Sequence, residues 1–518
     1  MQGAARGRKK KGAFSMKKAM KKLMAALLAV AMVCAMAIPA FADGSSSTAS
    51  APVTLYKITA PATTHIYEIY QIFTGDYDAS NASMLANIKW GKNGTGTAGD
   101  AVEQTVLDAL SAVASYTSDS DKLDVIENYV KLNTTPIATV TNGNFVEVVG
   151  GYYLIKDKDG TVPSSAAYTP YIVSVVGNVT IEPKSNEVPE FTKKLKDTND
   201  TTGVITGWQD SADYDIGDKI PFRLQGTVSK DFDSYKTYYY AFHDVEEKGL
   251  TFDSSSVKVF VGDEVTGTKI DASNYTVVTS PTDGCTFEIV FDDLKKVTGV
   301  TAKSIITVTY ESTLNTNAVL GAQGNVNTAK LEYSNNPRGN GTGTTPWDNV
   351  IVFTYKVVVN KIDQAGQPLE GAEFTLTKKL KDGTEVDMPM NIDTSNKALF
   401  TLSGLDDGEY TLTETVTPAH YNTISPITFT VNADHTITWD ATPRDTVLTS
   451  LSGNKVIGEI TFDVDKTAGS LTTNVVNKIG TTLPGTGGIG TTIFYVIGGG
   501  LMVAAAILLI TKKRMENR

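Results

Sequence analysis

The chain has 518 residues, of which 41% are hydrophobic and 20% are charged. This balance excludes a mostly disordered chain, because disordered proteins contain too few apolar residues to form a core. The length exceeds what one core can organise, so we expect three or four domains of ~150 residues. Long helical periodicity is scarce, whereas Gly, Thr, Val and Tyr are plentiful, and this favours strands and turns.

The beginning of the chain has the features of a secretory signal peptide, predicted at residues 1–42. Its first 22 residues contain nine Lys or Arg and no acid, and the apolar run Leu23–Ile38 follows. Small residues then lead to Ala42, so we predict cleavage between Ala42 and Asp43. An uncleaved membrane anchor is the alternative, and Met16 is a second possible start.

We expect a mainly β fold made of three modules in tandem. Residues 43–187 alternate like strands around a helical stretch at 101–131, which predicts a β domain with a helical insertion. Strands spaced by turn signals predict immunoglobulin-like β-sandwiches for residues 188–345 and 350–480. The segment 335–345 between these two is rich in turn-forming residues and is interpreted as a linker.

The end of the chain predicts a membrane-spanning helix. Residues 489–510 are uncharged and long enough to cross a bilayer, and the basic tail 511–518 fits retention on the inner side. A short motif precedes the helix: Leu483, Pro484, Gly485, Thr486 and Gly487.

Without both ends, the remaining chain is acidic and nearly free of cysteine. Residues 43–486 contain 33 basic and 56 acidic residues, a formal net charge of −23. This excludes a nucleic-acid-binding surface, which needs basic residues. Cys285 is the one cysteine in this segment, so no intramolecular disulfide can form. A large core or another kind of cross-link must stabilise the exported protein.

The sequence predicts no metal site and no cofactor. The histidines show no ligand spacing, and the glycine-rich stretches do not lie between a strand and a helix as phosphate loops do. The histidines are His65, His243, His420 and His435.

The motif, the apolar span and the basic tail together resemble the LPxTG sorting signal read by sortases. The resemblance implies cleavage between Thr486 and Gly487 and transfer of the Thr486 acyl group to an amine. It also implies a cell-wall location for a precursor that is transiently anchored in the membrane. The alternative is a chance Pro-Gly turn before a transmembrane helix.

A candidate acceptor amine lies between the first and second modules. The segment around Lys184 resembles the pilin motif of sortase-assembled pili, usually written YPKN. Pro183 and Lys184 match this motif, whereas Glu182 and Ser185 replace its tyrosine and asparagine. The resemblance implies that Lys184 accepts the threonine of another subunit, and the alternative is an ordinary exposed lysine.

Polar residues of the second module are expected on inward strand faces. Side chains alternate along a strand, so Lys193 lies between two apolar neighbours on one face, where an unpaired ammonium is costly. The pattern resembles the CnaA-type pilin domain, which implies an isopeptide bond between Lys193 and Asn327 promoted by Asp244. Lys194 and Asn325 remain alternatives, as does a plain buried salt bridge.

The third module resembles a CnaB-type domain. Its opening matches the pattern K-x-D…G-x-x-L-x-G-A-x-F, and a later segment resembles the E-box that carries Glu414, with His420 where the family has glycine. The resemblance implies an isopeptide bond between Lys361 and Asn477 promoted by Glu414. Asn474 remains an alternative to Asn477.

The expected chemistry of both bonds follows from burial. Burial lowers the pKa of a lysine and raises that of an acid, so a neutral amine can lie beside a protonated carboxyl group. The acid is expected to bind the asparagine carbonyl and make it more electrophilic, after which the amine attacks and ammonia leaves.

Together these features resemble the major pilins of the SpaA and FimA type. The resemblance implies a structural subunit, not an enzyme, that polymerises covalently with other copies of itself. A class C sortase would link Thr486 to Lys184, and a housekeeping sortase would attach the pilus to peptidoglycan. Ancillary pilins are implied partners. The alternatives are a wall-anchored adhesin or ancillary pilin, and a wall-anchored hydrolase.

Overall fold

The computed structural model describes most of the chain after the predicted signal peptide. The described residues are 53–77, 85–116, 119–163, 166–168, 170–175, 177–182, 188–337, 339–439, 443–480 and 489–516. The predicted cleavage site at Ala42 and Asp43, the acceptor Lys184 and the motif 483–487 lie outside these residues.

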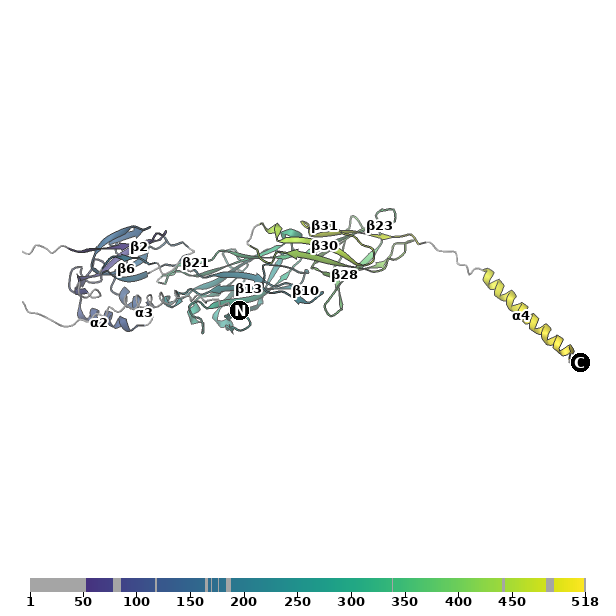
Figure 1. Ribbon diagram of the computed structural model, residues 1–518, viewed down its shortest axis with the longest axis horizontal. Helices are drawn as coiled ribbons and strands as arrows, with labels where there is room; N and C mark the ends of the chain where they lie inside the picture. Colours follow the sequence, from purple (N-terminus) through teal and green to yellow (C-terminus); the bar gives the residue numbers. More distant parts are fainter. Residues whose placement is uncertain are drawn as a thin grey trace, which may run out of the picture.

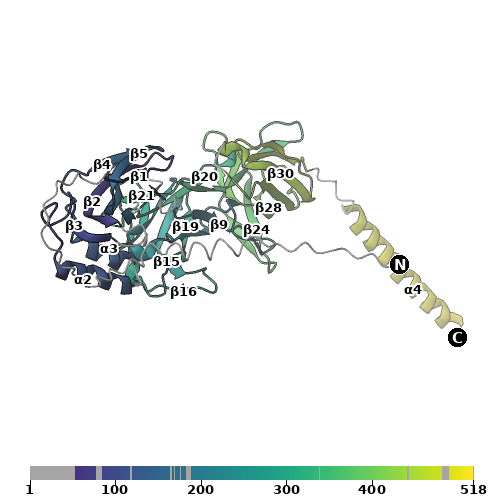
Figure 2. The same cartoon turned by 60° about the vertical axis from the view of Figure 1, so that its left-hand side comes forward.

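The mainly β fold predicted from the sequence is confirmed, and its strands form three groups in chain order. Figure 1 shows these groups in a row, with the helix α4 (Ile489–Glu516) beyond the third. The turned view in Figure 2 shows the same succession. Within the described residues, α4 contains one apolar segment long enough to cross a membrane, Phe494–Met515, with a mean hydropathy of 2.2.

The first group contains two sheets and the predicted helical insertion. A three-stranded sheet has the order β5-β1-β8, and a second sheet has the order β3-β2-β6-β7 with β4 paired to β2. The helices cover one side of Tyr70, Trp90 and Leu154 with apolar residues at helical spacing. The elements are β1 (Leu55–Thr59), β2 (Ile66–Tyr77), β3 (Leu85–Trp90), α2 (Gln104–Ala112), η1 (Val113–Ser115), α3 (Asp119–Glu127), β4 (Ala138–Thr141), β5 (Phe145–Val149), β6 (Gly151–Asp157), β7 (Pro170–Val175) and β8 (Val179–Thr180).

The second group is a β-sandwich. One sheet has the order β12-β22-β20-β14-β18-β17 with β21 paired to β20, and the other has the order β16-β15-β19-β13-β9. Alternate residues of each sheet point inward and form one core, in which Phe222 and Tyr310 face Phe242 and Leu331. The strands are β9 (Phe191–Leu195), β10 (Thr198–Asn199), β11 (Val204–Ile205), β12 (Ser211–Asp213), β13 (Lys219–Thr227), β14 (Tyr240–Glu246), β15 (Leu250–Val261), β16 (Thr268–Lys269), β17 (Thr276–Val278), β18 (Phe287–Phe291), β19 (Ile305–Leu314), β20 (Asn325–Ser334), β21 (Thr342–Thr344) and β22 (Asp348–Phe353).

The turn-rich segment 335–345 is not the linker that the sequence predicts. Its strand β21 pairs with β20, and β22 then continues the same sheet to Phe353. Glycine and asparagine permit tight turns inside a sheet as readily as they permit a linker, so their number does not distinguish the two. The second sandwich therefore includes β22, and the third group begins after Thr354.

The third group is a smaller sandwich of two five-stranded sheets. Their orders are β26-β27-β23-β32-β31 and β25-β24-β28-β29-β30. The first strand β23 and the last long strand β32 are parallel neighbours in one sheet. The strands are β23 (Tyr355–Asp363), β24 (Glu373–Lys379), β25 (Glu385–Met388), β26 (Asn391–Ile392), β27 (Leu399–Leu405), β28 (Gly408–Val416), β29 (Ile427–His435), β30 (Leu448–Ile457), β31 (Asp463–Asp465) and β32 (Ser470–Asn477).

Candidate cross-link sites and wall anchor

The second sandwich buries a lysine beside an acid. Lys193 lies on the edge strand β9, and its side chain points into the core, where it is fully buried. Its Nζ donates to Asp244 Oδ2 at 2.5 Å and to the Tyr310 hydroxyl at 2.8 Å. The Tyr310 hydroxyl in turn donates to Asp244 Oδ2 at 2.8 Å. The two sheets thus bring an amine, a carboxyl group and a phenol together in the core.

Asn327 joins this cluster through Tyr310. Its Nδ2 donates to the Tyr310 hydroxyl at 2.9 Å and to Glu246 Oε1 at 3.3 Å. Asn327 Oδ1 and Asp244 Oδ1 are buried and have no hydrogen-bond partner among the described residues. Buried polar atoms rarely stay unpaired, so these two oxygens are exceptions within the core.

The alternatives to Lys193 and Asn327 have other partners. Lys194 points to the opposite face of β9, where its ammonium pairs with Asp210. Asn325 binds backbone groups: its Oδ1 accepts from the Val319 amide at 2.8 Å, and its Nδ2 donates to the Val352 carbonyl at 3.2 Å. These contacts favour the pair Lys193 and Asn327.

Burial controls the ionisation of the second-sandwich site. It lowers the pKa of Lys193 and raises the pKa of Asp244, although each group favours the charged form of the other. Burial, with the neighbouring Asp244, also raises the pKa of Glu246 to about 7. These shifts favour the neutral amine and the protonated acid that the expected reaction requires.

The third sandwich buries a second cluster that also contains a lysine, an acid and an asparagine. Lys361 on β23 and Asn477 on β32 lie on neighbouring parallel strands, and Glu414 reaches them from β28 in the other sheet. Lys361 Nζ donates to Asn477 Oδ1 and lies 3.2 Å from Glu414 Oε1. Asn477 Nδ2 donates to the two Glu414 oxygens at 2.8 and 3.1 Å. Burial lowers the pKa of Lys361.

The position of Glu414 differs from the expectation in one respect. Its carboxylate contacts the amide nitrogen of Asn477, not the carbonyl oxygen. That nitrogen would leave as ammonia, and Lys361 Nζ would lose a proton, so Glu414 touches both the proton donor and the proton acceptor. The alternative Asn474 lies on the exposed face of β32 and accepts from Asn360 Nδ2 at 3.2 Å.

His420 lies in the E-box turn with a φ angle of 75°. This is the left-handed region that glycine adopts without strain, which explains why a glycine is expected there.

Sequence reasoning missed two members of the second-sandwich cluster, Tyr310 and Glu246. Glu246 follows Asp244 by two residues on β14 and therefore shares its inward face. Tyr310 occupies a buried position in the alternating pattern of β19. Alternation alone could have placed both residues in the core, but it could not have shown that they face Lys193.

Family models match three parts of the chain. Residues 216–337 match the model described as Gram-positive pilin backbone subunit 2, Cna-B-like domain. Residues 355–444 match the SpaA prealbumin-like fold domain, and residues 475–517 match the LPXTG cell wall anchor motif. The second module, which resembles the CnaA type by its sequence pattern, thus matches a model whose description names the Cna-B type. None of the three models describes an enzyme family.

Individual relatives are more distant. The trypsin-resistant surface T6 protein of Streptococcus pyogenes is 25% identical over 294 residues, 51% of this chain and 50% of the relative. The chain thus spans about half the length of this curated relative.

Solved structures of major pilins cover more of the chain at lower identity. The three-domain T6 backbone pilin of Streptococcus pyogenes is 16% identical, with a TM-score of 0.49, and the match covers 82% of this chain and 99% of the pilin. The major pilin SpaD of Corynebacterium diphtheriae is 17% identical, with a TM-score of 0.45, over 83% and 98% of the two chains.

The anchor motif and the apolar helix α4 belong together, because a sorting signal consists of a motif followed by a membrane-spanning segment. The chain is therefore a wall-anchored surface protein, homologous to the T6 protein, that carries a Gram-positive pilin backbone domain, a prealbumin-like domain and an LPXTG cell wall anchor motif.

Proposed function

We propose that this chain is the structural subunit of a covalently joined pilus shaft. The matches to a pilin backbone domain and to a wall anchor support this function. The observation that carries it is the pair of buried clusters of lysine, acid and asparagine, one in each of the last two sandwiches. In this proposal the mature chain begins at Asp43, and its domains end near residues 187, 354 and 480.

Each cluster forms an isopeptide bond without an external enzyme. The neutral amine of Lys193 or Lys361 attacks the side-chain carbonyl carbon of Asn327 or Asn477. The new bond joins Nζ to that carbon, the bond from the carbon to the amide nitrogen breaks, and the nitrogen leaves as ammonia with the proton lost by the amine. Each bond therefore removes one ammonia, about 17 Da, from the chain.

The bonds stabilise the sandwiches against unfolding and against force. They close loops of 134 and 116 residues, counted from Lys193 to Asn327 and from Lys361 to Asn477. By analogy with disulfides, closure of such loops constrains the unfolded chain by ~5 kcal/mol each. A covalent link between two strands also carries load that their hydrogen bonds would otherwise bear.

Subunits are joined by amide bonds of a different origin, which an enzyme makes between chains. A class C sortase cleaves after Thr486 and transfers its acyl group to Lys184 of another copy, and repetition builds a shaft. A housekeeping sortase joins the last subunit to peptidoglycan, and ancillary pilins complete the pilus. The sequence around Lys184 and the anchor match support this order of events.

The test is the size distribution of the protein released from the cell wall. The parent protein is expected to give a ladder of high-mass species, and Lys184→Arg is expected to reduce it to a single wall-linked band. Lys296→Arg, which alters a lysine whose side chain is 78% exposed, is the control and is expected to leave the ladder unchanged.

Two outcomes would contradict the proposal. A ladder that persists in Lys184→Arg overturns the assignment of Lys184. A single band in the parent overturns polymerisation and favours a solitary wall-anchored adhesin.

A further inference from the structure

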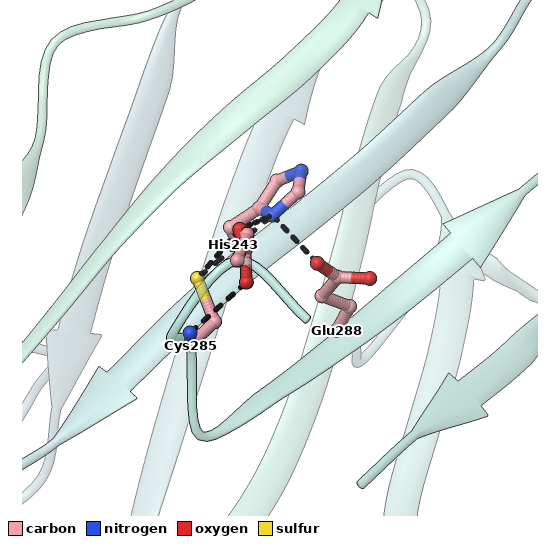
Figure 3. A group of neighbouring side chains, drawn as sticks. His243, Cys285 and Glu288 are labelled. Carbon is pink, nitrogen blue, oxygen red and sulfur yellow. Dashed lines mark hydrogen bonds and ion pairs between the residues drawn. The ribbon is translucent and has the colours of Figure 1, made fainter. Parts of the chain in front are cut away.

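A mixed cluster of metal-binding side chains lies on the outer face of the second sandwich. His243 on β14 is paired in register with Glu288 on β18, so their side chains lie side by side on one face. The loop before β18 adds Asp283 and Cys285. Figure 3 shows Cys285 and Glu288 on either side of His243. This face is opposite to the one that holds Asp244, so the cluster is separate from the isopeptide site.

The four ligand atoms have the spacing of a single coordination sphere. His243 Nδ1 lies 3.1 Å from Asp283 Oδ2, 3.0 Å from Glu288 Oε1 and 3.9 Å from Cys285 Sγ. Cys285 Sγ lies 3.1 Å from Asp283 Oδ2, and all four atoms lie within 4.8 Å of one another. Around a tetrahedral ion with bonds of ~2.0–2.3 Å, ligand atoms are separated by roughly 3.3–3.8 Å.

A fifth residue orients the histidine as in known metal sites. His243 Nε2 lies 2.9 Å from Glu332 Oε2 on β20. A carboxylate on one ring nitrogen holds the proton there and leaves the lone pair of the other nitrogen free for a metal. The Cys285 amide donates to Asp283 Oδ1 at 3.0 Å, which turns the other oxygen of Asp283 toward the cluster.

The charge of the cluster also calls for a cation. The Nδ1 nitrogen of His243 faces two carboxylates and a thiol, and none of these ligands makes an ion pair with a lysine or arginine in the described part of the chain. The acidic cluster of Asp200, Asp215 and Asp406 differs, because the ammonium of Lys378 occupies its centre.

We propose that His243, Asp283, Cys285 and Glu288 bind one divalent transition-metal ion of the zinc class. Nitrogen, sulfur and carboxylate donors together suit Zn²⁺ or Co²⁺, whereas Ca²⁺ and Mg²⁺ require oxygen ligands. The Asp283 side chain is 39% exposed, so the ion can enter from solvent without unfolding of the sheet. The bound ion fastens the loop before β18 to strand β14.

The experiment is a metal titration of the full chain, purified in detergent and stripped with a chelator. Calorimetry is expected to show one equivalent of Zn²⁺ bound with micromolar or tighter affinity. Titration with Co²⁺ is expected to give the absorption of tetrahedral coordination together with a thiolate-to-cobalt charge-transfer band. Absence of stoichiometric binding overturns the proposal.

Variants separate this site from the other clusters. Cys285→Ser is expected to abolish the charge-transfer band and to weaken Zn²⁺ binding at least tenfold. Glu332→Gln is expected to keep the band and weaken binding by about 10- to 100-fold, because it alters only the orientation of His243. His435→Gln, in a different cluster with two aspartates, is the control and is expected to bind as the parent does. A band that survives in Cys285→Ser, or that disappears in His435→Gln, contradicts the assignment.

Discussion

The two lysines proposed to form isopeptide bonds face different proton-transfer problems. In the third sandwich, Glu414 contacts both Lys361 Nζ and the Asn477 amide nitrogen, so one carboxyl group can take the proton of the amine and deliver it to the leaving ammonia. In the second, Asp244 contacts Lys193, whereas Glu246 contacts Asn327, and the Tyr310 hydroxyl lies between the two halves. The bond proposed in the second sandwich therefore depends on a bridging phenol that the bond proposed in the third sandwich does not need.

The bridging role of Tyr310 makes Tyr310→Phe informative. The parent chain is expected to lose two molecules of ammonia, about 34 Da in all. The variant loses a hydrogen bond that positions both reacting groups, so the Lys193–Asn327 bond is expected to form roughly tenfold more slowly or worse. Intact-mass spectra recorded at intervals after synthesis are expected to show a species about 17 Da heavier than the fully cross-linked form of the same variant.

A matched control tests whether any change in the tyrosines of this core has the same effect. The Tyr333 hydroxyl is buried and has no hydrogen-bond partner in the described part of the chain. Tyr333→Phe is therefore expected to lose both molecules of ammonia as fast as the parent does. If both variants lose ammonia as fast as the parent, the bridging role of Tyr310 is wrong.

The sequence predicts inward-facing residues better than it predicts their contacts. Alternation along a strand is sufficient to place Lys193 and Lys361 in cores, because an inward lysine interrupts an apolar face. It also distinguishes Asn477 from Asn474, which lie on opposite faces of β32. Alternation cannot show which strand of the other sheet faces a given residue. The contacts of Tyr310 with Lys193, Asp244 and Asn327 are therefore known only from the folded chain.

At the scale of elements, the sequence predicts where strands lie but not which sheet each strand joins. The run Asp348–Phe353 has the composition of a strand, but it pairs with β20 only because residues 335–347 lead the chain back along that strand. Its parallel partner β12 lies still farther away along the chain. Because pairing depends on such distant residues, the boundary between the second and third modules had to come from the structure.

The same boundary is held by buried charged groups from both sandwiches. Lys378 Nζ on β24 lies 2.5 Å from Asp215 Oδ2 of the second sandwich and 3.1 Å from Asp406 Oδ2 of the third. His435 Nε2 on β29 lies 3.4 Å from Asp197 Oδ2 and 3.7 Å from Asp213 Oδ1, and both aspartates belong to the second sandwich. Removal of one member leaves the others buried without a counter-charge, so substitution of any of these residues is expected to destabilise the junction.

His435 makes the stability of the junction depend on pH. Burial opposes protonation, but hydrogen bonds with Asp197 and Asp213 outweigh it and raise the pKa of His435 to about 10. A group whose pKa is raised on folding contributes its full stabilisation below the unfolded pKa, ~6.5, and loses it as the pH rises through the folded pKa. We expect the melting temperature to fall between pH 7 and pH 10, by a few degrees more in the parent than in His435→Gln.

The control for this prediction is a histidine outside the junction. His420→Asn alters an exposed turn residue with a positive φ angle, a conformation that asparagine tolerates. This variant is expected to keep the pH dependence of the parent. Identical pH dependence in the parent and in His435→Gln would show that the ion cluster contributes nothing in this range.

At the scale of the whole molecule, the proposed bonds follow the path that tension would take. If a neighbouring subunit is attached at Lys184, load enters the chain nine residues before Lys193 and leaves it at Thr486, nine residues after Asn477. The first group of strands then lies off this path. Among the described residues the buried lysines are Lys193, Lys361 and Lys378, and none of them lies in the first group. The proposed cross-links thus coincide with the two sandwiches that would bear load.

This coincidence predicts how the molecule extends when it is pulled between residues 184 and 486. The parent can lengthen only where the chain is not bridged, because residues enclosed by an isopeptide bond cannot extend under load. Asn477→Ala frees 116 residues and Asn327→Ala frees 134, which corresponds to roughly 390 and 450 Å of extra extension at about 3.4 Å per residue. Single-molecule force spectroscopy measures these lengths directly. Asn474→Ala, on the exposed face of the same strand as Asn477, is expected to extend as the parent does. If the parent itself releases these lengths at moderate force, load passes through hydrogen bonds alone, and the two sandwiches are not covalently bridged.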